Sequence, residues 1–266
     1  MFDSGVGGLT VLRALRDVLP AEDFIYLGDT ARLPYGTKSP ATVSAYACQA
    51  SRLLVERGVK ALVVACNTAS AFALQDLRRQ FPDIPVFGVV EPGATAAASA
   101  AGPAGIVILA TESTIRGGAY QRALLQRVAD VPIYGRSCPL WVTLAEMGTR
   151  SVDLVQAIVA NDLRGFLRPS QNPLTVLLGC THFPVFKETI QSLFDAAGEE
   201  VQVVDSATTT AAAVKTQLHT ARMTKTGDTS GSIQLLATDG AERFSQVGQQ
   251  FLFSNPVLSS VELVDL

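Results

Sequence analysis

The chain has 266 residues, of which 48% are hydrophobic and 17% are charged, and its formal net charge is −3 at pH 7. This composition is typical of a folded chain with one large or two modest cores, and it excludes a disordered one. The negative charge and the scattered basic residues argue against nucleic acid as the main partner.

The longest apolar stretches, such as residues 105–110, have the length of a strand and are too short to span a bilayer. No basic region followed by an apolar signal segment opens the chain, so we expect a cytoplasmic protein that does not bind a membrane. With four cysteines, two histidines and no CxxC pair, we expect reduced thiols and no metal site.

Strand-like and helix-like segments alternate along the chain. A glycine-rich turn at Asp3-Ser4-Gly5-Val6-Gly7-Gly8 leads into a helix that begins near Leu9. Apolar runs predict strands at 24–27, 61–65, 86–90, 106–110, 174–178, 201–204 and 233–237. Helical patterns lie at 40–57, 69–80, 92–101, 115–128, 139–147, 151–166, 184–197, 206–219 and 240–251. Residues 224–232, rich in Gly, Thr and Ser, read as a surface loop.

Because these strands are apolar on both faces and separated by helices, they predict an α/β fold with mostly parallel sheets. We expect two similar domains, each a sheet flanked by helices, with the active site in the cleft between them. The chain would cross near Glu91-Pro92-Gly93 and return near Val204-Asp205-Ser206. The first domain then comprises 1–91 plus 206–266, and the second comprises 92–205.

Two similar cysteine segments are the most informative feature of the sequence. Cys66, in Ala65-Cys66-Asn67-Thr68, and Cys180, in Gly179-Cys180-Thr181-His182, each end a buried strand and precede a helix. Ligands bind beyond such strand ends, and a helix start favours the thiolate. Cys66 could instead be a small buried hydrophobe, and His182 could be a helix-start residue bonded to backbone. The repetition favours paired acid and base chemistry.

Other polar residues near strand ends have two readings. Asp3 is a helix cap or a carboxylate that assists Cys66, and Thr111 and Thr114 are caps or hydroxyl donors to an anion. The loop at Leu33-Pro34-Tyr35-Gly36 is a plain turn or presents backbone groups and a tyrosine to a pocket. We expect the remaining polar candidates to be structural: Cys48, Cys138 and Glu146, the last a satisfied structural or cleft-rim carboxylate rather than a catalyst.

These segments together resemble the glutamate racemases, a family of cofactor-independent amino-acid racemases. The matching segments span nearly the whole chain and include Phe2–Thr10, Pro34–Gly36, Ala65–Ala69, Val90–Pro92, Thr111 with Thr114, Cys138–Leu140, Gly179–His182 and Val204–Ala207. No single segment is decisive, but the set is specific. The resemblance implies two α/β domains that enclose L- or D-glutamate, no cofactor, a role in peptidoglycan synthesis, and a homodimer.

The resemblance also implies the roles of individual residues. Cys66 and Cys180 would lie on opposite faces of the glutamate α-carbon, one removing a proton as thiolate and the other delivering one as thiol. Asp3 would assist Cys66, and His182 would assist Cys180. The ammonium and the two carboxylates would be held by Ser4, Tyr35, Gly36, Asn67, Thr68, Thr111, Thr114 and Thr181.

One feature departs from the family pattern. The family usually has several apolar residues before the Phe-Asp-Ser-Gly motif, whereas here only Met1 precedes Phe2. Either the start is truncated or the first strand is nearly absent, and in both cases we expect Asp3 to be poorly anchored.

Three other functions stay open from the residues alone. A racemase for aspartate or another acidic amino acid would share the fold and both cysteines. A cysteine hydrolase would use Cys180 and His182 and would not need Cys66. An anion-binding module would bind a ligand without proton exchange.

Overall fold

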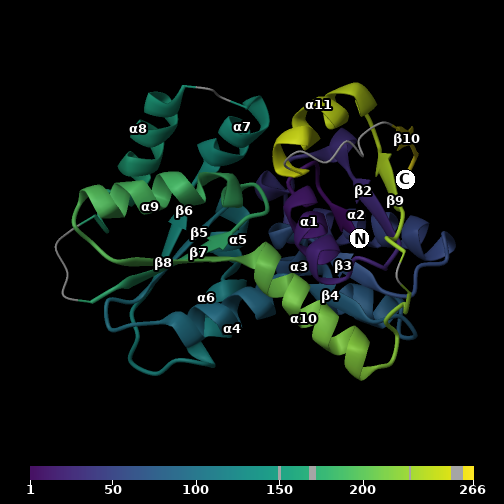
Figure 1. The fold of residues 1–266 in the computed structure, drawn as a ribbon, viewed down its shortest axis with the longest axis horizontal. Helices are drawn as coiled ribbons and strands as arrows, with labels where there is room; N and C mark the ends of the chain where they lie inside the picture. The colour runs from purple at the N-terminus through teal and green to yellow at the C-terminus, as the bar shows by residue number, and fades with distance from the viewer. Residues whose placement is uncertain (149–150, 168–171, 228, 253–259) are drawn as a thin grey trace.

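The computed structural model describes residues 1–148, 151–167, 172–227, 229–252 and 260–266. It contains two sheets that lie side by side, with helices flanking each of them (Figure 1). Every strand pair in both sheets is parallel. The predicted α/β architecture with two parallel sheets is therefore confirmed.

The strands of the two sheets come from different parts of the chain. The first sheet has the order β10-β9-β2-β1-β3-β4, which are Val261–Leu263, Ile233–Ala237, Phe24–Gly28, Phe2–Asp3, Leu62–Val64 and Val86–Gly88. The second sheet has the order β6-β5-β7-β8, which are Ile133–Ser137, Ile106–Ala110, Leu174–Gly179 and Val201–Asp205.

The helices follow the strands in chain order. The α-helices are α1 Leu9–Val18, α2 Pro40–Glu56, α3 Asn67–Gln80, α4 Val90–Ala100, α5 Glu112–Gly117, α6 Ala119–Leu125, α7 Pro139–Met147, α8 Val152–Leu163, α9 Lys187–Ala196, α10 Ser206–Thr220 and α11 Ala241–Leu252. The 3-10 helices are η1 Thr30–Arg32, η2 Tyr35–Thr37 and η3 Phe183–Phe186. Among the described residues, no helix is both long and apolar enough to cross a membrane.

Two helices carry the chain between the sheets. After β4 the chain enters α4 and continues into β5 of the second sheet, and after β8 it returns through α10 to β9. The helix α4 begins at Val90 and α10 begins at Ser206, and the two helices pack against each other. Figure 1 shows α10 running from the second sheet along the first.

The helix α1 is held against the sheet by hydrophobic packing of one face. Leu9, Leu12 and Leu15 recur at the spacing of one helix face, and all three are buried in the largest core cluster. Phe244 and Phe251 of α11 belong to the same cluster. Burying each such side chain contributes about 1.5–3 kcal/mol. The apolar face of α1 therefore anchors the glycine-rich turn that precedes it.

Several predicted bounds differ from the structure. The helix predicted at 115–128 is broken at Gly118, whose φ of 64° lies in the left-handed region, so α5 ends before it and α6 begins after it. The strand predicted at 86–90 stops at Gly88 because α4 begins at Val90. The helix predicted at 184–197 begins as the 3-10 turn η3. The loop predicted at 224–232 is irregular where it is described; residue 228 lies outside the described residues.

Two strands were not predicted. β6 and β10 lie at the edges of their sheets, and most of their side chains are partly or fully exposed. Without a run of buried apolar residues, neither segment has the pattern of a buried strand.

The first strand is short, as expected, but Asp3 is well anchored. β1 is only two residues long, and it pairs with β2 on one side and β3 on the other. Asp3 is fully buried, and its carboxylate accepts a hydrogen bond from the Gly5 amide. The prediction of a poorly anchored Asp3 is therefore wrong, because a central position in the sheet buries even a two-residue strand.

Candidate active site

Cys66 lies just beyond the carboxyl end of β3 and caps α3. Its sulfur accepts a hydrogen bond from the Ala69 amide at 3.5 Å, and its S–H donates to Ser4 Oγ at 3.8 Å. Burial, followed by the nearby charge of Asp3, raises the pKa of Cys66 to about 12. The Ala69 and Ser4 contacts lower this pKa, as expected for a helix start, but burial outweighs them. Cys66 therefore rests as a thiol and needs a base to become a thiolate.

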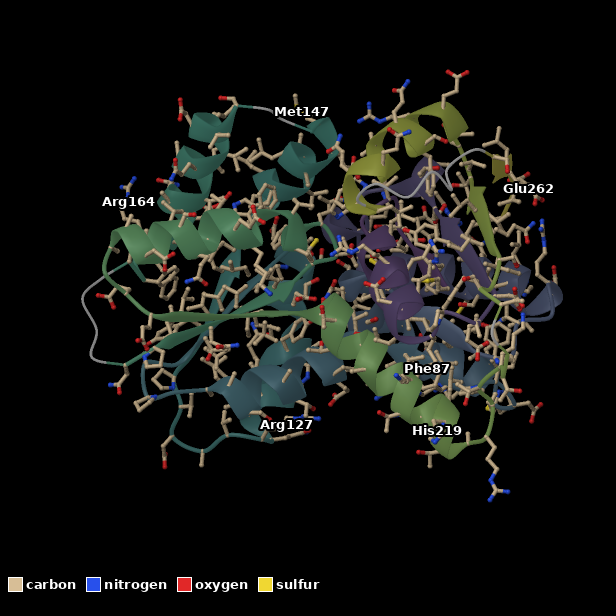
Figure 2. The ribbon with its side chains drawn as sticks, viewed as in Figure 1. Phe87, Arg127, Met147, Arg164, His219 and Glu262 are labelled. Atoms are coloured by element: carbon tan, nitrogen blue, oxygen red, sulfur yellow. The ribbon has the colours of Figure 1, made fainter. Side chains whose placement is uncertain are left out.

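Cys180 directly follows β7 and lies beside a histidine. Its sulfur is 3.7 Å from His182 Nδ1, and His182 Nε2 is 3.1 Å from Glu146 Oε1 of α7. Burial lowers the pKa of His182, but its contacts with Cys180 and Glu146 outweigh burial and raise that pKa to about 10. His182 is therefore positively charged at neutral pH. The other histidine, His219, is exposed in the last turn of α10 (Figure 2).

Asp3 connects the surroundings of the two cysteines. Its Oδ2 accepts the Gly5 amide at 3.1 Å, and its Oδ1 accepts the Thr181 hydroxyl at 3.4 Å. Burial raises the pKa of Asp3, against the lowering effects of the His182 charge and of these hydrogen bonds. Asp3 thus binds a proton more readily than an exposed aspartate does, and its charge is felt at both Cys66 and His182.

The glycine-rich turn gives the loop after β7 room to approach. A Cβ on Gly7 would lie 2.5 Å from His182 Nδ1 and 2.6 Å from Thr181 Oγ1. The Thr10 hydroxyl also reaches this loop, at 2.9 Å from the Thr181 carbonyl. Because Thr10 follows the first strand and Thr181 follows β7, the carboxyl edges of the two sheets meet here.

Three threonine hydroxyls form a second contact between the sheets. Thr68 Oγ1 of α3 lies 3.1 Å from both Thr111 Oγ1 and Thr114 Oγ1, and these two are 2.9 Å apart. Gly36 packs against this group, since a Cβ there would lie 2.8 Å from Thr111 Cβ. The Ser113 hydroxyl donates to the Gly36 carbonyl. The structure therefore brings four of the predicted site residues together.

The sequence allows two readings of the loop at Tyr35, a plain turn or a tyrosine presented to a pocket. In the structure the Tyr35 side chain is buried, and its hydroxyl donates to Asp29 Oδ2. Asp29 also accepts from Arg32 Nε and Thr238 Oγ1. What Tyr35 and Gly36 can offer a ligand is backbone N–H, because they open η2 and the first amides of a helix have no partner inside it.

Four polar residues of this region were missed or undervalued in the sequence. Asp29 directly follows β2, at the same sheet edge as Asp3. Its position after a predicted strand could therefore have identified it as a candidate site residue. The sequence predicts that Glu146 is a structural or rim carboxylate, but in the structure it contacts His182. Tyr120 and Ser206 both accept hydrogen bonds from the Asn67 amide, and nothing in the sequence indicates that contact.

The other two cysteines lie apart from these contacts. Cys48 is half-buried within α2, and the buried Cys138 precedes α7, where its S–H donates to the Arg136 carbonyl at 3.7 Å. All four cysteines are free. Within the described part of the chain, no three His, Cys, Asp or Glu side chains gather as a metal site.

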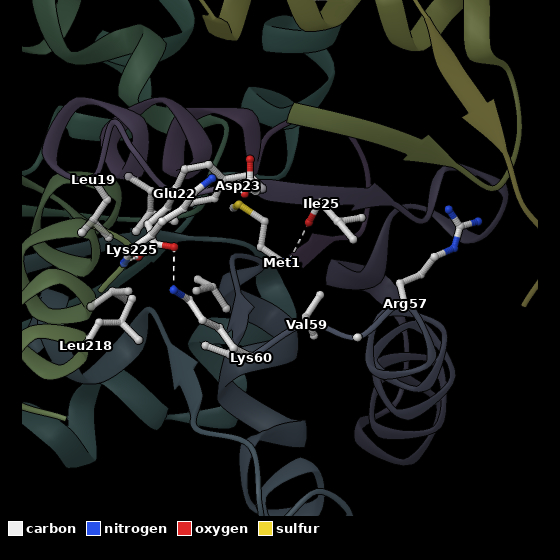
Figure 3. A pocket seen from close by; sticks show the side chains of 16 residues that line it. Met1, Leu19, Glu22, Asp23, Ile25, Arg57, Val59, Lys60, Leu218 and Lys225 are labelled. Atoms are coloured by element: carbon white, nitrogen blue, oxygen red, sulfur yellow. Dashed lines mark hydrogen bonds and ion pairs between the residues drawn. The ribbon is translucent and has the colours of Figure 1, made fainter. Parts of the chain in front are cut away.

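A cavity also lies away from the cysteines. It has a volume of about 500 Å³ and opens at the amino ends of β2 and β3, next to Met1 (Figure 3). Lys60 Nζ lies 2.7 Å from Glu22 Oε2 at its rim, and the Met1 ammonium donates to the Ile25 carbonyl. Because ligands of such sheets bind beyond the carboxyl ends, this cavity is not where the cysteine chemistry takes place.

Known proteins resemble this chain in sequence and in overall fold. The Asp/Glu/Hydantoin racemase family matches residues 9–214. A glutamate racemase of Geobacter metallireducens is 43% identical over 252 residues, which are 95% of this chain and 91% of the relative. Among solved structures, the glutamate racemase isoform RacE1 of Bacillus anthracis superposes with a TM-score of 0.89, at 32% identity over 100% of this chain and 96% of that one.

A second solved structure carries a ligand. The glutamate racemase of Francisella tularensis, in complex with D-glutamate, superposes with a TM-score of 0.87, at 32% identity over 99% of this chain and 96% of that one. Identity and coverage at this level establish common ancestry along nearly the whole chain. The chain belongs to the glutamate racemase family.

Proposed function

We propose that this chain interconverts L- and D-glutamate without a cofactor, using two thiols as acid and base. The observation that carries the proposal is the pair of buried cysteines, Cys66 and Cys180, at carboxyl strand ends of different sheets. Each has its own titratable neighbour, Asp3 for Cys66 and His182 for Cys180. Relatives named glutamate racemases support glutamate as the substrate.

The chemistry needs a base on one face of the α-carbon and an acid on the other. One cysteine, as thiolate, takes the α-proton, and the other, as thiol, gives a proton to the opposite face. The two exchange roles when the other enantiomer binds. Asp3, whose pKa is raised by burial, takes the proton of Cys66, and His182 exchanges protons with Cys180. Glu146 holds His182 in place and in its charged form.

The substrate groups are held by donors that are already in position. The threonine hydroxyls, the first backbone amides of η2 and the Ser4 hydroxyl surround this region. The proposed ligands of the ammonium and carboxylates are Ser4, Tyr35, Gly36, Asn67, Thr68, Thr111, Thr114 and Thr181. Both cysteines are only 5% exposed, so the developing carbanion is stabilised by fixed donors rather than by water.

The wider assignment is also a proposal. We infer a cytoplasmic enzyme that supplies D-glutamate for peptidoglycan, and a homodimer. We place the domains at 1–91 plus 206–266 and at 92–205, consistent with the passages of the chain through α4 and α10.

Single-cysteine variants test the proposal. Cys66→Ala and Cys180→Ala should each lower racemisation of glutamate by about 10³-fold or more, since each removes one of two required groups. Cys48→Ala is the matched control and should keep wild-type activity. Racemisation retained in Cys66→Ala would contradict the two-thiol chemistry. A hydrolytic activity that survives Cys66→Ala and is lost in Cys180→Ala, with no racemisation, would instead favour a Cys180–His182 hydrolase. Faster racemisation of aspartate than of glutamate would overturn the substrate assignment.

A further inference from the structure

The side-chain amide of Asn67 is held in a buried polar cluster next to Cys66. Asn67 Nδ2 donates to the Tyr120 hydroxyl at 2.7 Å and to Ser206 Oγ at 3.2 Å. Asn67, Tyr120 and Ser206 are all buried, and they come from α3, α6 and the first residue of α10. The cluster therefore connects α3, which follows a strand of the first sheet, to α6 and α10, which follow strands of the second sheet.

The directions of these hydrogen bonds determine which way the amide points. Ser206 has one hydroxyl hydrogen and donates it to the Leu178 carbonyl at 3.2 Å, so its oxygen acts as an acceptor toward Asn67. If the Asn67 amide were rotated by 180°, its carbonyl oxygen would face Ser206 Oγ, and both atoms would be acceptors. Ser206 could then donate to Asn67 only by losing its hydrogen bond to the Leu178 carbonyl. The amino group of Asn67 must therefore face Tyr120 and Ser206.

The carbonyl of Asn67 is left for another partner. Asn67 Oδ1 is buried and has no hydrogen-bond partner among the described residues, and Asn67 as a whole is only 3% exposed. A buried acceptor without a partner is costly, so such an atom in a site is a candidate ligand contact. Of the three charged groups of glutamate, only the ammonium donates hydrogen bonds.

We propose that Tyr120 and Ser206 are positioning residues, which hold Asn67 so that its side-chain carbonyl accepts a hydrogen bond from the substrate ammonium. The inference rests on the proposed function. The sequence resemblance assigns Asn67 to the ammonium and carboxylates of the substrate as a group, and in the structure Tyr120 and Ser206 already use its amide donor. The position supports this, since Asn67 adjoins Cys66, and Leu178 lies two residues before Cys180.

Two ligands that differ only in the ammonium separate this role from a merely structural one. Glutarate has the two carboxylates of glutamate and no ammonium. We would measure by calorimetry the dissociation constants of L-glutamate and glutarate for the wild type, Tyr120→Phe and Ser206→Ala. In both variants we expect glutamate to bind about tenfold more weakly and glutarate to change by less than about twofold, with a smaller change in kcat than in KM.

Thr175→Val is the matched control. Its hydroxyl is likewise buried and donates to one backbone carbonyl, that of Ala100 at 3.0 Å, but it lies toward the amino end of β7. It should change neither dissociation constant. If Tyr120→Phe fails to fold, as shown by thermal unfolding, Ser206→Ala still carries the test.

The outcomes distinguish this inference from the proposed function. Equal weakening of both ligands, or of glutarate alone, would show that Asn67 serves a carboxylate and would overturn the inference. Unchanged binding of both ligands would overturn it as well. If the variants show the selective effect but the wild type does not racemise glutamate, only the proposed function is contradicted. A wild type that binds neither ligand would contradict both.

Discussion

Burial shifts the pKa values of Cys66 and His182 in opposite directions, and it decides the result for Cys66 but not for His182. Burial raises the pKa of Cys66, and Asp3 adds to the rise, so the thiol stays protonated. Burial lowers the pKa of His182, but Cys180 and Glu146 outweigh it, so the imidazole stays charged. Cys66 therefore starts as a neutral thiol, whereas Cys180 starts beside a positively charged imidazole.

The raised pKa of His182 predicts a pH-dependent stability. The pKa rises from 6.5 to about 10 in the folded chain, so the native state binds the proton more tightly than the unfolded state. This contribution is fully present below pH 6.5 and is lost as the pH rises through about 10. We expect the stability advantage of the wild type over His182→Asn to shrink by a few kcal/mol, in order of magnitude, across this window.

Denaturant unfolding at several pH values measures this advantage. His219→Asn is the control, because His219 is exposed at the end of α10. An advantage of the wild type over His182→Asn that is constant from pH 6 to 10 would show that the folded site does not hold a proton on His182.

The contact between Glu146 and His182 predicts a shifted pH–rate profile. Glu146→Gln removes the carboxylate charge that helps to raise the pKa of His182. The charged imidazole is then lost at lower pH, so the alkaline limb of kcat/KM should move to lower pH. Glu112→Gln, which removes an exposed ion pair with Arg116, should leave the profile in place. Coincident profiles for the wild type and Glu146→Gln would mean that Glu146 is only a rim carboxylate.

The glycine-rich turn before α1 is predicted from the sequence only as the lead into a helix. In the structure, Gly7 is also the point where His182 and Thr181 come close. No pattern within residues 3–8 could show this, because the contact depends on the loop after β7, far along the chain.

A methyl group at Gly7 should therefore disturb catalysis. Gly7→Ala places a Cβ 2.5 Å from His182 Nδ1, so the imidazole must move away from its present position. Since displacing a catalytic group by about 1 Å can cost 10²-fold, we expect a loss of roughly this size in kcat. Gly165→Ala is the control, because a Cβ there meets nothing within 4 Å. Wild-type kcat in Gly7→Ala would show that the position of His182 has no influence on the rate.

Elements that are buried on both faces were predicted from the sequence, and exposed edge elements were not. β5 and β7, buried on both faces, were recognised from apolar runs, and α7 was predicted with its observed bounds because Cys138-Pro139 marks its start. The edge strands β6 and β10 lack such runs and were missed. The strand-end rule identified both cysteine segments, but Tyr120 and Glu146 come from helices whose contacts are set by packing between distant segments.

The two sheets meet through side chains that are also proposed to bind the substrate, so ligand binding should stabilise the whole molecule. At 100 times the dissociation constant a ligand adds about 2.7 kcal/mol, which corresponds to roughly 5–10 °C in Tm for a chain of this size. Thr114→Val removes one of the three hydroxyls shared between α3 and α5 and should reduce this shift. The measurement is calorimetric Tm with and without glutamate at one fixed concentration.

The control for this experiment is Thr216→Val, whose exposed hydroxyl donates to the Ala212 carbonyl on the outside of α10. It should keep the full ligand-induced shift. Equal shifts in Thr114→Val and in the wild type would place the substrate carboxylates away from the threonine hydroxyls.

The most direct test of the central claim is incubation with L-glutamate in heavy water, following the α-hydrogen of both enantiomers early in the reaction. If Cys66 and Cys180 act on opposite faces, D-glutamate should form with deuterium at the α-carbon while the remaining L-glutamate keeps its original hydrogen. A single base that serves both faces would return deuterium to both enantiomers at comparable rates. That result, or racemisation without any deuterium in the product, would contradict the two-thiol account.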